Sequence, residues 1–228
     1  MRFDIITVFP SFFECLNEYG VIGKAIKDSK IEINAVNLRD YSNNKHKKVD
    51  DEIYGGGPGM LMTPEPIYNA IQDLKMDNSK VVFLSPQGKL LNQQMVEEFS
   101  ESDHLILLCG HYEGVDQRII DNFIDYEVSI GDYVLTGGEI PAMAFIDAVS
   151  RFIPDVLGNE ESAISDSLYD GLLKYSVYTR PSEFMGHKVP EVLLSGNHKL
   201  IEEWRRESSL KNTENKRPDL YKKYSKGE

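Results

Sequence analysis

Three glycine-containing turns that carry polar or titratable side chains lie at the expected ends of strands. They are Leu84–Gly88 (LSPQG), Cys109–Gly114 (CGHYEG) and Ile130–Gly138 (IGDYVLTGG). Loops at the carboxyl ends of parallel strands meet at one edge of a sheet, where α/β proteins bind their ligands. None of the three turns offers a lysine for a phosphate group, and neither common glycine motif for nucleotide phosphates occurs in the sequence. Such loops therefore suit a neutral or cationic adenosine compound.

The same residues permit two simpler interpretations. A single turn of this kind needs no function, because glycine and proline commonly make turns, but three at successive strand ends favour a site. Cys109 and His111 are the residue types of a thiol nucleophile and its base. Their spacing does not fit that chemistry, and Cys109 ends an apolar run, which predicts a buried thiol. The pattern therefore argues against a cysteine hydrolase.

The turns lie between segments that alternate between strand and helix patterns. Continuous apolar runs indicate buried parallel strands, and segments with helical spacing follow them. The expected strands are residues 3–9, 31–38, 81–85 and 105–109, and the expected helices are 11–28, 91–99, 115–123 and 138–153. This alternation predicts an open α/β sheet with right-handed crossovers.

Two long segments interrupt the alternation. Residues 42–62 are charged and then rich in glycine (YGGGPG, Tyr54–Gly59), and residues 154–178 show no regular pattern. Long loops in compact domains are usually functional or disordered, and clustered glycines permit close approach of a ligand to the backbone. Residues 195–225 have a helical pattern. We therefore predict an α/β domain over residues 1–160, a flexible linker over 161–176 and a helical domain over 177–228.

The composition is typical of a soluble globular protein, with 41% hydrophobic and 27% charged residues among 228. Two cysteines are too few for a disulfide framework or a zinc site made of cysteines alone. No segment has the pattern of a signal peptide or the length of a membrane span, so we expect a cytoplasmic protein. The net charge of −12 argues against a generic nucleic-acid binder, but basic residues outnumber acidic ones between Lys199 and Lys226.

Seven motifs, in order along nearly the whole chain, resemble the bacterial tRNA (guanine(37)-N1)-methyltransferases, the TrmD family of the SPOUT class. The motifs are DDEIYGGGPGMLM, LSPQG, CGHYEGVDQRI, SIGDYVLTGGEIPAM, SRFIPDVLG, YTRPSEF and VPEVLLSGNH. The resemblance implies a SPOUT-type parallel sheet with a C-terminal trefoil knot, followed by a small all-α C-terminal domain. It also implies methyl transfer from S-adenosylmethionine to N1 of guanine 37 in the tRNA anticodon loop.

The resemblance places the cofactor in the three glycine-containing turns. The loop around Ile130–Leu135 is part of the knot in this family and wraps the cofactor. The positions so assigned are Leu84, Ser85, Pro86, Gly110, Tyr112, Glu113, Gly114, Ser129, Ile130, Gly131, Asp132, Tyr133, Val134, Leu135, Gly137, Gly138 and Pro141.

The resemblance also assigns the two catalytic residues. Guanine N1 is not nucleophilic while it holds its proton, so methylation there needs a general base and a cation near O6, where negative charge develops. The matching motifs give the base to Asp166 and the cation to Arg151. Without the resemblance, Arg151 is simply a cation at a helix end and Asp166 an N-cap.

The implied substrate is tRNA in which guanine 36 precedes guanine 37, and the implied assembly is an obligate homodimer. Its active site lies at the subunit interface, where Asp166 reaches the cofactor of the other subunit. An unpaired loop guanine is splayed into a pocket at modest cost. Residues expected near the tRNA are His46, Asp50, Pro58, Gly59 and Glu113, and expected phosphate contacts are Arg205, Arg206, Lys216 and Arg217.

One stretch departs from the family pattern. In GLLKYSVYTRP, Lys174 and Ser176 stand where the family usually has an acid and a proline. The family depends on Mg²⁺, and the missing acid leaves the use of Mg²⁺ here open. Two other functions also stay open: a knotted methyltransferase that acts on a different RNA base, and a non-catalytic tRNA-binding or adenosine-sensing protein. The YGGGPG loop, with Arg151 and Asp166, favours guanine N1.

Overall fold

Five parallel strands form the central sheet of the first of two units, residues 1–158 and 159–228. The computed structural model describes residues 1–18, 20–158 and 166–226. The strands are β1 (Arg2–Thr7), β2 (Glu32–Asn37), β5 (Lys80–Leu90), β6 (His104–Cys109) and β7 (Tyr126–Ser129). They lie in the order β2-β1-β6-β5-β7, and every neighbouring pair is parallel. The predicted open α/β sheet is confirmed.

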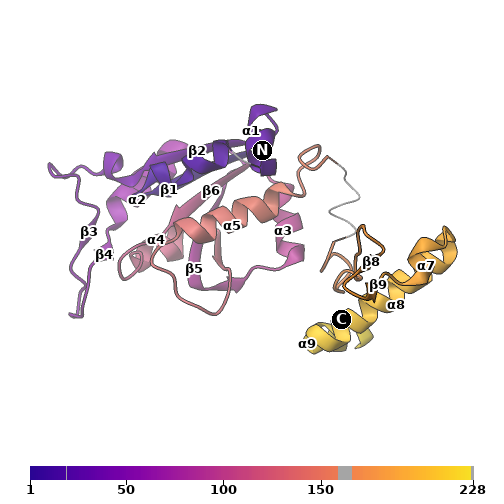
Figure 1. Cartoon of the computed structure of the whole chain (residues 1–228). Helices are drawn as coiled ribbons and strands as arrows, with labels where there is room; N and C mark the ends of the chain where they lie inside the picture. Colours follow the sequence, from indigo (N-terminus) through magenta and orange to yellow (C-terminus); the bar gives the residue numbers. More distant parts are fainter. Residues whose placement is uncertain (19, 159–165, 227–228) are drawn as a thin grey trace. The chain divides into compact units, whose positions relative to one another are not determined.

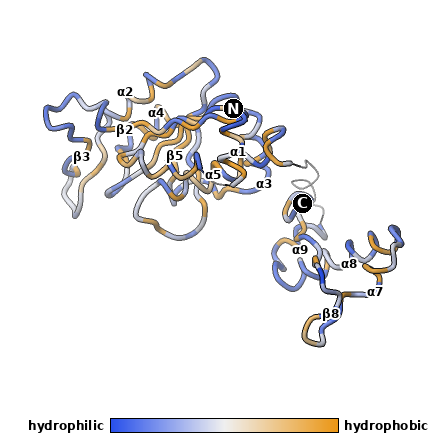
Figure 2. Tube along the Cα trace, turned by 45° about the horizontal axis from the view of Figure 1, so that its top comes forward, coloured by the Kyte–Doolittle hydropathy of each residue, from blue (hydrophilic) through white to orange (hydrophobic). Residues whose placement is uncertain are grey.

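Helices cover both faces of this sheet, as Figures 1 and 2 show. Along β6, Leu105 and Leu107 face one hydrophobic core, and Ile106 and Leu108 face the other, because side chains alternate along a strand. The first core contains η1 (Pro10–Asn17), α1 (Gly20–Lys27), α3 (Gln93–Ser100) and α5 (Glu139–Ser150), and the second contains η2 (Leu38–Tyr41), α2 (Pro64–Leu74) and α4 (Gln117–Phe123).

None of the helices in the described ranges is long and apolar enough to cross a membrane.

The helix expected over residues 11–28 is two elements, so that prediction was wrong in its continuity. A 3₁₀ helix, η1, ends at Asn17, and α1 begins at Gly20, whose φ of 68° lies in the left-handed region that glycine tolerates. Helix α2 was not predicted. Its first turn contains Pro64 and Pro66, which look like loop residues in a sequence, although proline is well tolerated in the first turn of a helix.

The segment 42–62, expected as a long loop, contains two short strands, β3 (Asp50–Asp51) and β4 (Leu61–Met62), which pair antiparallel. Met62 also forms a parallel bridge with Val115, and its N–H donates to the carbonyl of Gly114. The glycine-rich loop is therefore fixed against the turn that follows β6.

The second unit contains α7 (Glu191–Leu194), α8 (His198–Lys216) and α9 (Pro218–Lys226). It also has a hairpin of β8 (Glu183–Phe184) and β9 (His187–Lys188), so the expectation of an all-α domain was wrong. The turn of this hairpin has Met185 and Gly186 at positive φ. A strand is recognised in a sequence by the alternation of apolar and polar residues, and a strand of two residues is too short to show it.

Residues 166–176 belonged to the predicted flexible linker, whose other residues, 161–165, lie outside the described ranges. Side chains of α8 hold this segment. The N–H of Leu173 donates to Thr213 Oγ1 (2.9 Å), and the N–H of Ser176 donates to Ser208 Oγ (3.0 Å). Asn212 Nδ2 donates to the carbonyl of Lys174 (3.0 Å). Residues 166–176 are thus fixed to α8 within the second unit.

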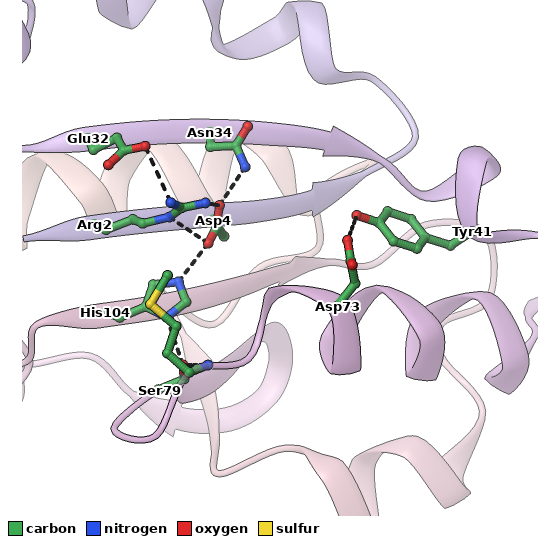
Figure 3. Close-up of polar contacts among 9 residues, drawn as sticks. Arg2, Asp4, Glu32, Asn34, Tyr41, Asp73, Ser79 and His104 are labelled. Carbon is green, nitrogen blue, oxygen red and sulfur yellow. Dashed lines mark hydrogen bonds and ion pairs between the residues drawn. The ribbon is translucent and has the colours of Figure 1, made fainter.

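A buried polar cluster fastens the amino ends of the strands (Figure 3). The carboxylate of Asp4, on β1, is fully buried and accepts two hydrogen bonds from Arg2, both 2.9 Å, and one from Asn34 on β2, 2.6 Å. His104 Nε2, on β6, lies 2.7 Å from Asp4 Oδ2, and its Nδ1 lies 2.7 Å from Ser79 Oγ. Burial raises the pKa of Asp4, but its bonds with Arg2, Asn34 and His104 outweigh burial and lower that pKa below its usual value.

Candidate ligand site at the carboxyl edge of the sheet

A cavity of about 490 Å³ lies against the irregular stretch of β5 between Leu84 and Lys89 and at the carboxyl ends of β6 and β7. The three turns singled out in the sequence form its wall. Of the predicted cofactor-binding residues, all except Asp132 line it. Ten further residues line it. Three of them belong to the predicted turns without having been assigned to the cofactor, Gln87, His111 and Thr136, and seven were not predicted, Leu61, Phe83, Val115, Gln117, Ile120, Glu127 and Val128. The structure thus brings the predicted residues together, and what the cavity binds stays a prediction.

The wall of this cavity has an acidic character. Among the described residues that line it, Glu113 and Glu127 are carboxylates, and none is a lysine or an arginine. A phosphate group would meet negative charge and no cation there, whereas a cationic ligand would be attracted. Leu84, Ile130 and Val134 add apolar surface. The cavity therefore suits an uncharged or positively charged compound with an apolar part.

Close contact between backbones shapes the wall. The N–H of Gly138 donates to the carbonyl of Gly110 (2.9 Å), and the N–H of Leu91 donates to the carbonyl of Ser129 (2.8 Å). A Cβ atom on Gly138 would lie 2.6 Å from the Cα of Cys109, which no side chain tolerates. The loop before α5 must therefore have glycine where it crosses the end of β6.

A buried hydrogen-bonded group, which the sequence analysis missed, lies behind this wall. Glu139 is 5% exposed at the start of α5. Its Oε1 accepts a bond from Thr7 Oγ1 (2.6 Å), and His111 Nε2 lies 2.7 and 2.8 Å from its two carboxylate oxygens. Since a carboxylate only accepts, His111 Nε2 carries the proton. The group links the ends of β1 and β6 to the start of α5.

Cys109, next to this group, is not a nucleophile. Its thiol is fully buried at the end of β6. Burial, and then the negative charge of Glu139, raise its pKa well above the usual value, so the thiol stays protonated. The geometry agrees with the expectation of an inert, buried cysteine.

The residues predicted near the substrate fall into two groups. Gly59 touches the site: a Cβ there would lie 2.5 Å from Glu113 Cγ, and the N–H of Glu113 donates to the carbonyl of Met60 (2.9 Å). Pro58 is exposed beside it. Asp50 pairs with Met62 in the β3–β4 ladder, and His46 is exposed in a turn; neither lines the cavity. Of these four residues, the structure places Gly59 against Glu113 of the cavity wall.

The two predicted catalytic residues do not line the cavity. Arg151 follows the last residue of α5, whereas Pro141, near its start, lines the cavity. Ten residues of helix separate the two positions by about 15 Å along the axis. Asp166 belongs to the second unit, where it lines a cavity of about 200 Å³ together with Lys174, Arg205 and Arg206.

Lys174, the departure from the family pattern, contacts Asp166. Its Nζ lies 3.7 Å from Asp166 Oδ1. Within the ranges that the structure describes, no group of three or more His, Cys, Asp or Glu side chains is placed to hold a metal ion.

Comparisons with known proteins agree on one family. A family model described as tRNA (Guanine-1)-methyltransferase TrmD matches residues 1–223. A protein of Finegoldia magna is 61% identical over 226 residues, which are 99% of this chain and 97% of the relative. A protein of Ruminiclostridium cellulolyticum is 55% identical, over 98% of this chain and 97% of the relative, and one of Clostridioides difficile is 53% identical, over 98% of each. All three are named tRNA (guanine-N(1)-)-methyltransferase.

Proposed function

This chain belongs to the tRNA (guanine-1)-methyltransferase family, and we propose that it methylates N1 of guanine 37 in tRNA with S-adenosylmethionine as the donor. Membership supports tRNA (guanine-N1)-methyltransferase activity. The observation that carries the choice of donor is the acidic cavity wall, which has carboxylates and no lysine or arginine among its described residues. A sulfonium cation suits such a wall, and the phosphates of a nucleotide do not.

The residues that would hold the donor are those of the three turns. The apolar side chains of Leu84, Ile130 and Leu135 would flank the adenosine, and the backbone groups of Gly110 and Gly138 would remain close to it. When bound, S-adenosylmethionine supplies a methyl group that its sulfonium already activates. The protein therefore needs to position the two substrates and remove one proton from guanine.

Asp166 and Arg151 would provide that proton chemistry. The N1–H bond of guanine breaks and its proton goes to the Asp166 carboxylate, while the N1–methyl bond forms as the sulfur–methyl bond breaks. Arg151 would stabilise the charge that moves to O6. Asp166 would first have to exchange its contact with Lys174 for the target base.

We propose a homodimer with shared sites, acting in the cytoplasm. Arg151 lies at the far end of α5 from the cavity of its own chain, by about 15 Å along the helix. A site that combines the cavity with Arg151 and Asp166 is most simply built from two copies of the chain. This geometry supports the dimer that the family resemblance implies.

We also propose the trefoil knot of the SPOUT class. Backbone bonds link Leu91 to Ser129 and Gly138 to Gly110, so the segment before α3 crosses the end of β7 and the segment before α5 crosses the end of β6. Such close crossings are what a knotted cofactor loop requires.

The basic side chains proposed for tRNA phosphates belong to α8 and the residue that follows it; they are Arg205, Arg206, Lys216 and Arg217.

The decisive assay uses unmodified tRNA with guanine at positions 36 and 37, and labelled S-adenosylmethionine. We expect label in the tRNA and a stop of reverse transcription at position 37, because N1-methylguanine blocks pairing. The matched control is the same tRNA with adenosine at position 37, which should accept no label. Label without a stop at 37 would indicate a different base, and absence of transfer would favour a non-catalytic tRNA-binding protein.

A further inference from the structure

Glu139 differs from the other carboxylates near the cavity because it is buried. Among the described residues, it has His111 and Thr7 as side-chain partners, and no lysine or arginine pairs with it. Glu113, by contrast, is exposed at the cavity wall. Water and salt screen an exposed charge, whereas a buried charge acts over a longer distance. The carboxylate behind the wall is therefore the stronger source of field.

This carboxylate lies directly behind the residues that line the cavity. A Cβ atom on Gly137 would meet Glu139 Oε2 at 2.7 Å and His111 Cε1 at 2.3 Å. Both Gly137 and His111 line the cavity. Gly137 and His111 thus lie between Glu139 and the cavity. The charge of Glu139 also reaches Cys109, where it adds to burial in raising the pKa of the thiol.

We propose that the buried Glu139–His111 pair makes the cavity discriminate by charge between the cofactor and its product. The inference rests on the proposed function, in which the ligand begins as a sulfonium cation and ends as a neutral thioether. The carboxylate of Glu139 is the negative partner of this pair, and it attracts the sulfonium and not the thioether. The pair therefore favours binding of S-adenosylmethionine and release of S-adenosylhomocysteine.

Glu139→Gln tests this inference, because it keeps the size of the side chain and removes the charge. Calorimetry would measure the affinities for S-adenosylmethionine and S-adenosylhomocysteine in the parent and in the variant. We expect the parent to bind the cation more tightly than the thioether. In Glu139→Gln the ratio of the two affinities should fall about tenfold, mostly because the affinity for S-adenosylmethionine falls. If Glu139 had a purely structural role, the substitution would lower the affinities for both ligands equally and leave their ratio unchanged. That result would overturn the inference.

Two variants serve as controls. Glu139→Asp keeps the charge and should keep most of the ratio. Asp4→Asn removes a buried carboxylate that also contacts a histidine, but at the other edge of the sheet, and should leave the ratio unchanged. A ratio that falls as far in Asp4→Asn as in Glu139→Gln would also contradict the inference.

If Glu139→Gln does not fold, the parent protein alone still provides a test. Sinefungin carries an ammonium group near the position of the sulfonium, and it should bind more tightly than the neutral thioether. Equal or weaker binding of sinefungin would overturn the inference. Failure of the proposed function looks different, because the parent would then bind none of the three adenosine compounds.

Discussion

The sheet has a buried carboxylate–histidine pair at each of its two edges. At the amino edge, Asp4 and His104 lie 2.7 Å apart on neighbouring strands (Figure 3). At the carboxyl edge, Glu139 lies behind the cavity wall, 2.7 Å from His111, which lines the cavity. Both carboxylates are almost without solvent exposure. The two pairs have the same chemistry and nearly the same geometry, so their surroundings must determine what each one does.

The difference lies in the cations nearby. Arg2 forms two hydrogen bonds with Asp4, which neutralise the buried charge and stabilise the amino edge. Glu139 has no such partner among the described residues, and its neighbours line a cavity. In a parallel sheet the carboxyl edge is where ligands bind. A charge satisfied within the protein therefore stabilises the fold, and a charge left without a cation remains available to a ligand.

The largest expected effect concerns the carboxyl edge. In Gly137→Val the new side chain would displace both His111 and Glu139, so we expect calorimetry to detect no binding of S-adenosylmethionine by a chain that remains folded. Gly158→Val is the matched control, because a Cβ at Gly158 has no atom within 4 Å. Unchanged affinity in Gly137→Val would contradict the placement of the donor at this edge.

Mixing two inactive variants tests whether two chains share each site. Gly137→Val should lack the donor and Asp166→Asn should lack the base, but a mixed dimer has one site with both. After random exchange of subunits, we expect about a quarter of the parent activity, since half the dimers are mixed and each has one intact site. If the mixture stays as inactive as the separate variants, each site belongs to one chain.

At the amino edge the expected effect is on stability. Asp4→Asn leaves Arg2 and His104 without their charged partner, and breaking a buried pair of this kind costs about 3 kcal/mol of unfolding free energy. Urea denaturation would measure this loss, and calorimetry should show unchanged affinity for S-adenosylmethionine. A variant as stable as the parent, but with weaker donor binding, would reverse the roles that we give to the two edges.

Lowering the pH should remove the stabilising effect of the Asp4 carboxylate. The pKa of Asp4 is lowered in the folded protein, so its stabilising effect is fully present above the unfolded pKa of about 3.9 and is lost as the pH falls through the lower, folded value. The stability difference between the parent and Asp4→Asn should therefore be constant from about pH 7 to 5 and shrink below about pH 4. A constant difference down to pH 2 would mean that Asp4 does not titrate with folding.

The sequence predicted the parts of the site that depend on neighbouring residues. Glycines mark the irregular stretch of β5 between Leu84 and Lys89 and the turns after β6 and β7, and these three stretches do form one cavity. The Thr7–Glu139 bond joins residues 132 positions apart, and no local pattern reveals such a contact. The same holds for Leu61, which reaches the cavity because Met62 pairs with Val115.

Errors in the predicted fold have a similar origin. The break between η1 and α1 depends on one backbone angle at Gly20, within a segment whose apolar spacing is helical throughout. In the second unit, the β8–β9 hairpin pairs two strands of only two residues each. Residues 166–176 are attached to α8 through individual hydrogen bonds with its side chains. Periodicity detects long regular elements and misses features of this size.

The central claim is that the chain methylates guanine N1 with Asp166 as the base. The most direct test is the single-turnover rate of methyl transfer to tRNA in the parent and in Asp166→Asn, which keeps the shape of the side chain and removes its basicity. We expect the rate to fall by about 10²–10⁴-fold while calorimetry shows nearly unchanged affinity for S-adenosylmethionine. Methylation by Asp166→Asn at the parent rate would show that Asp166 is not the base and would contradict this account.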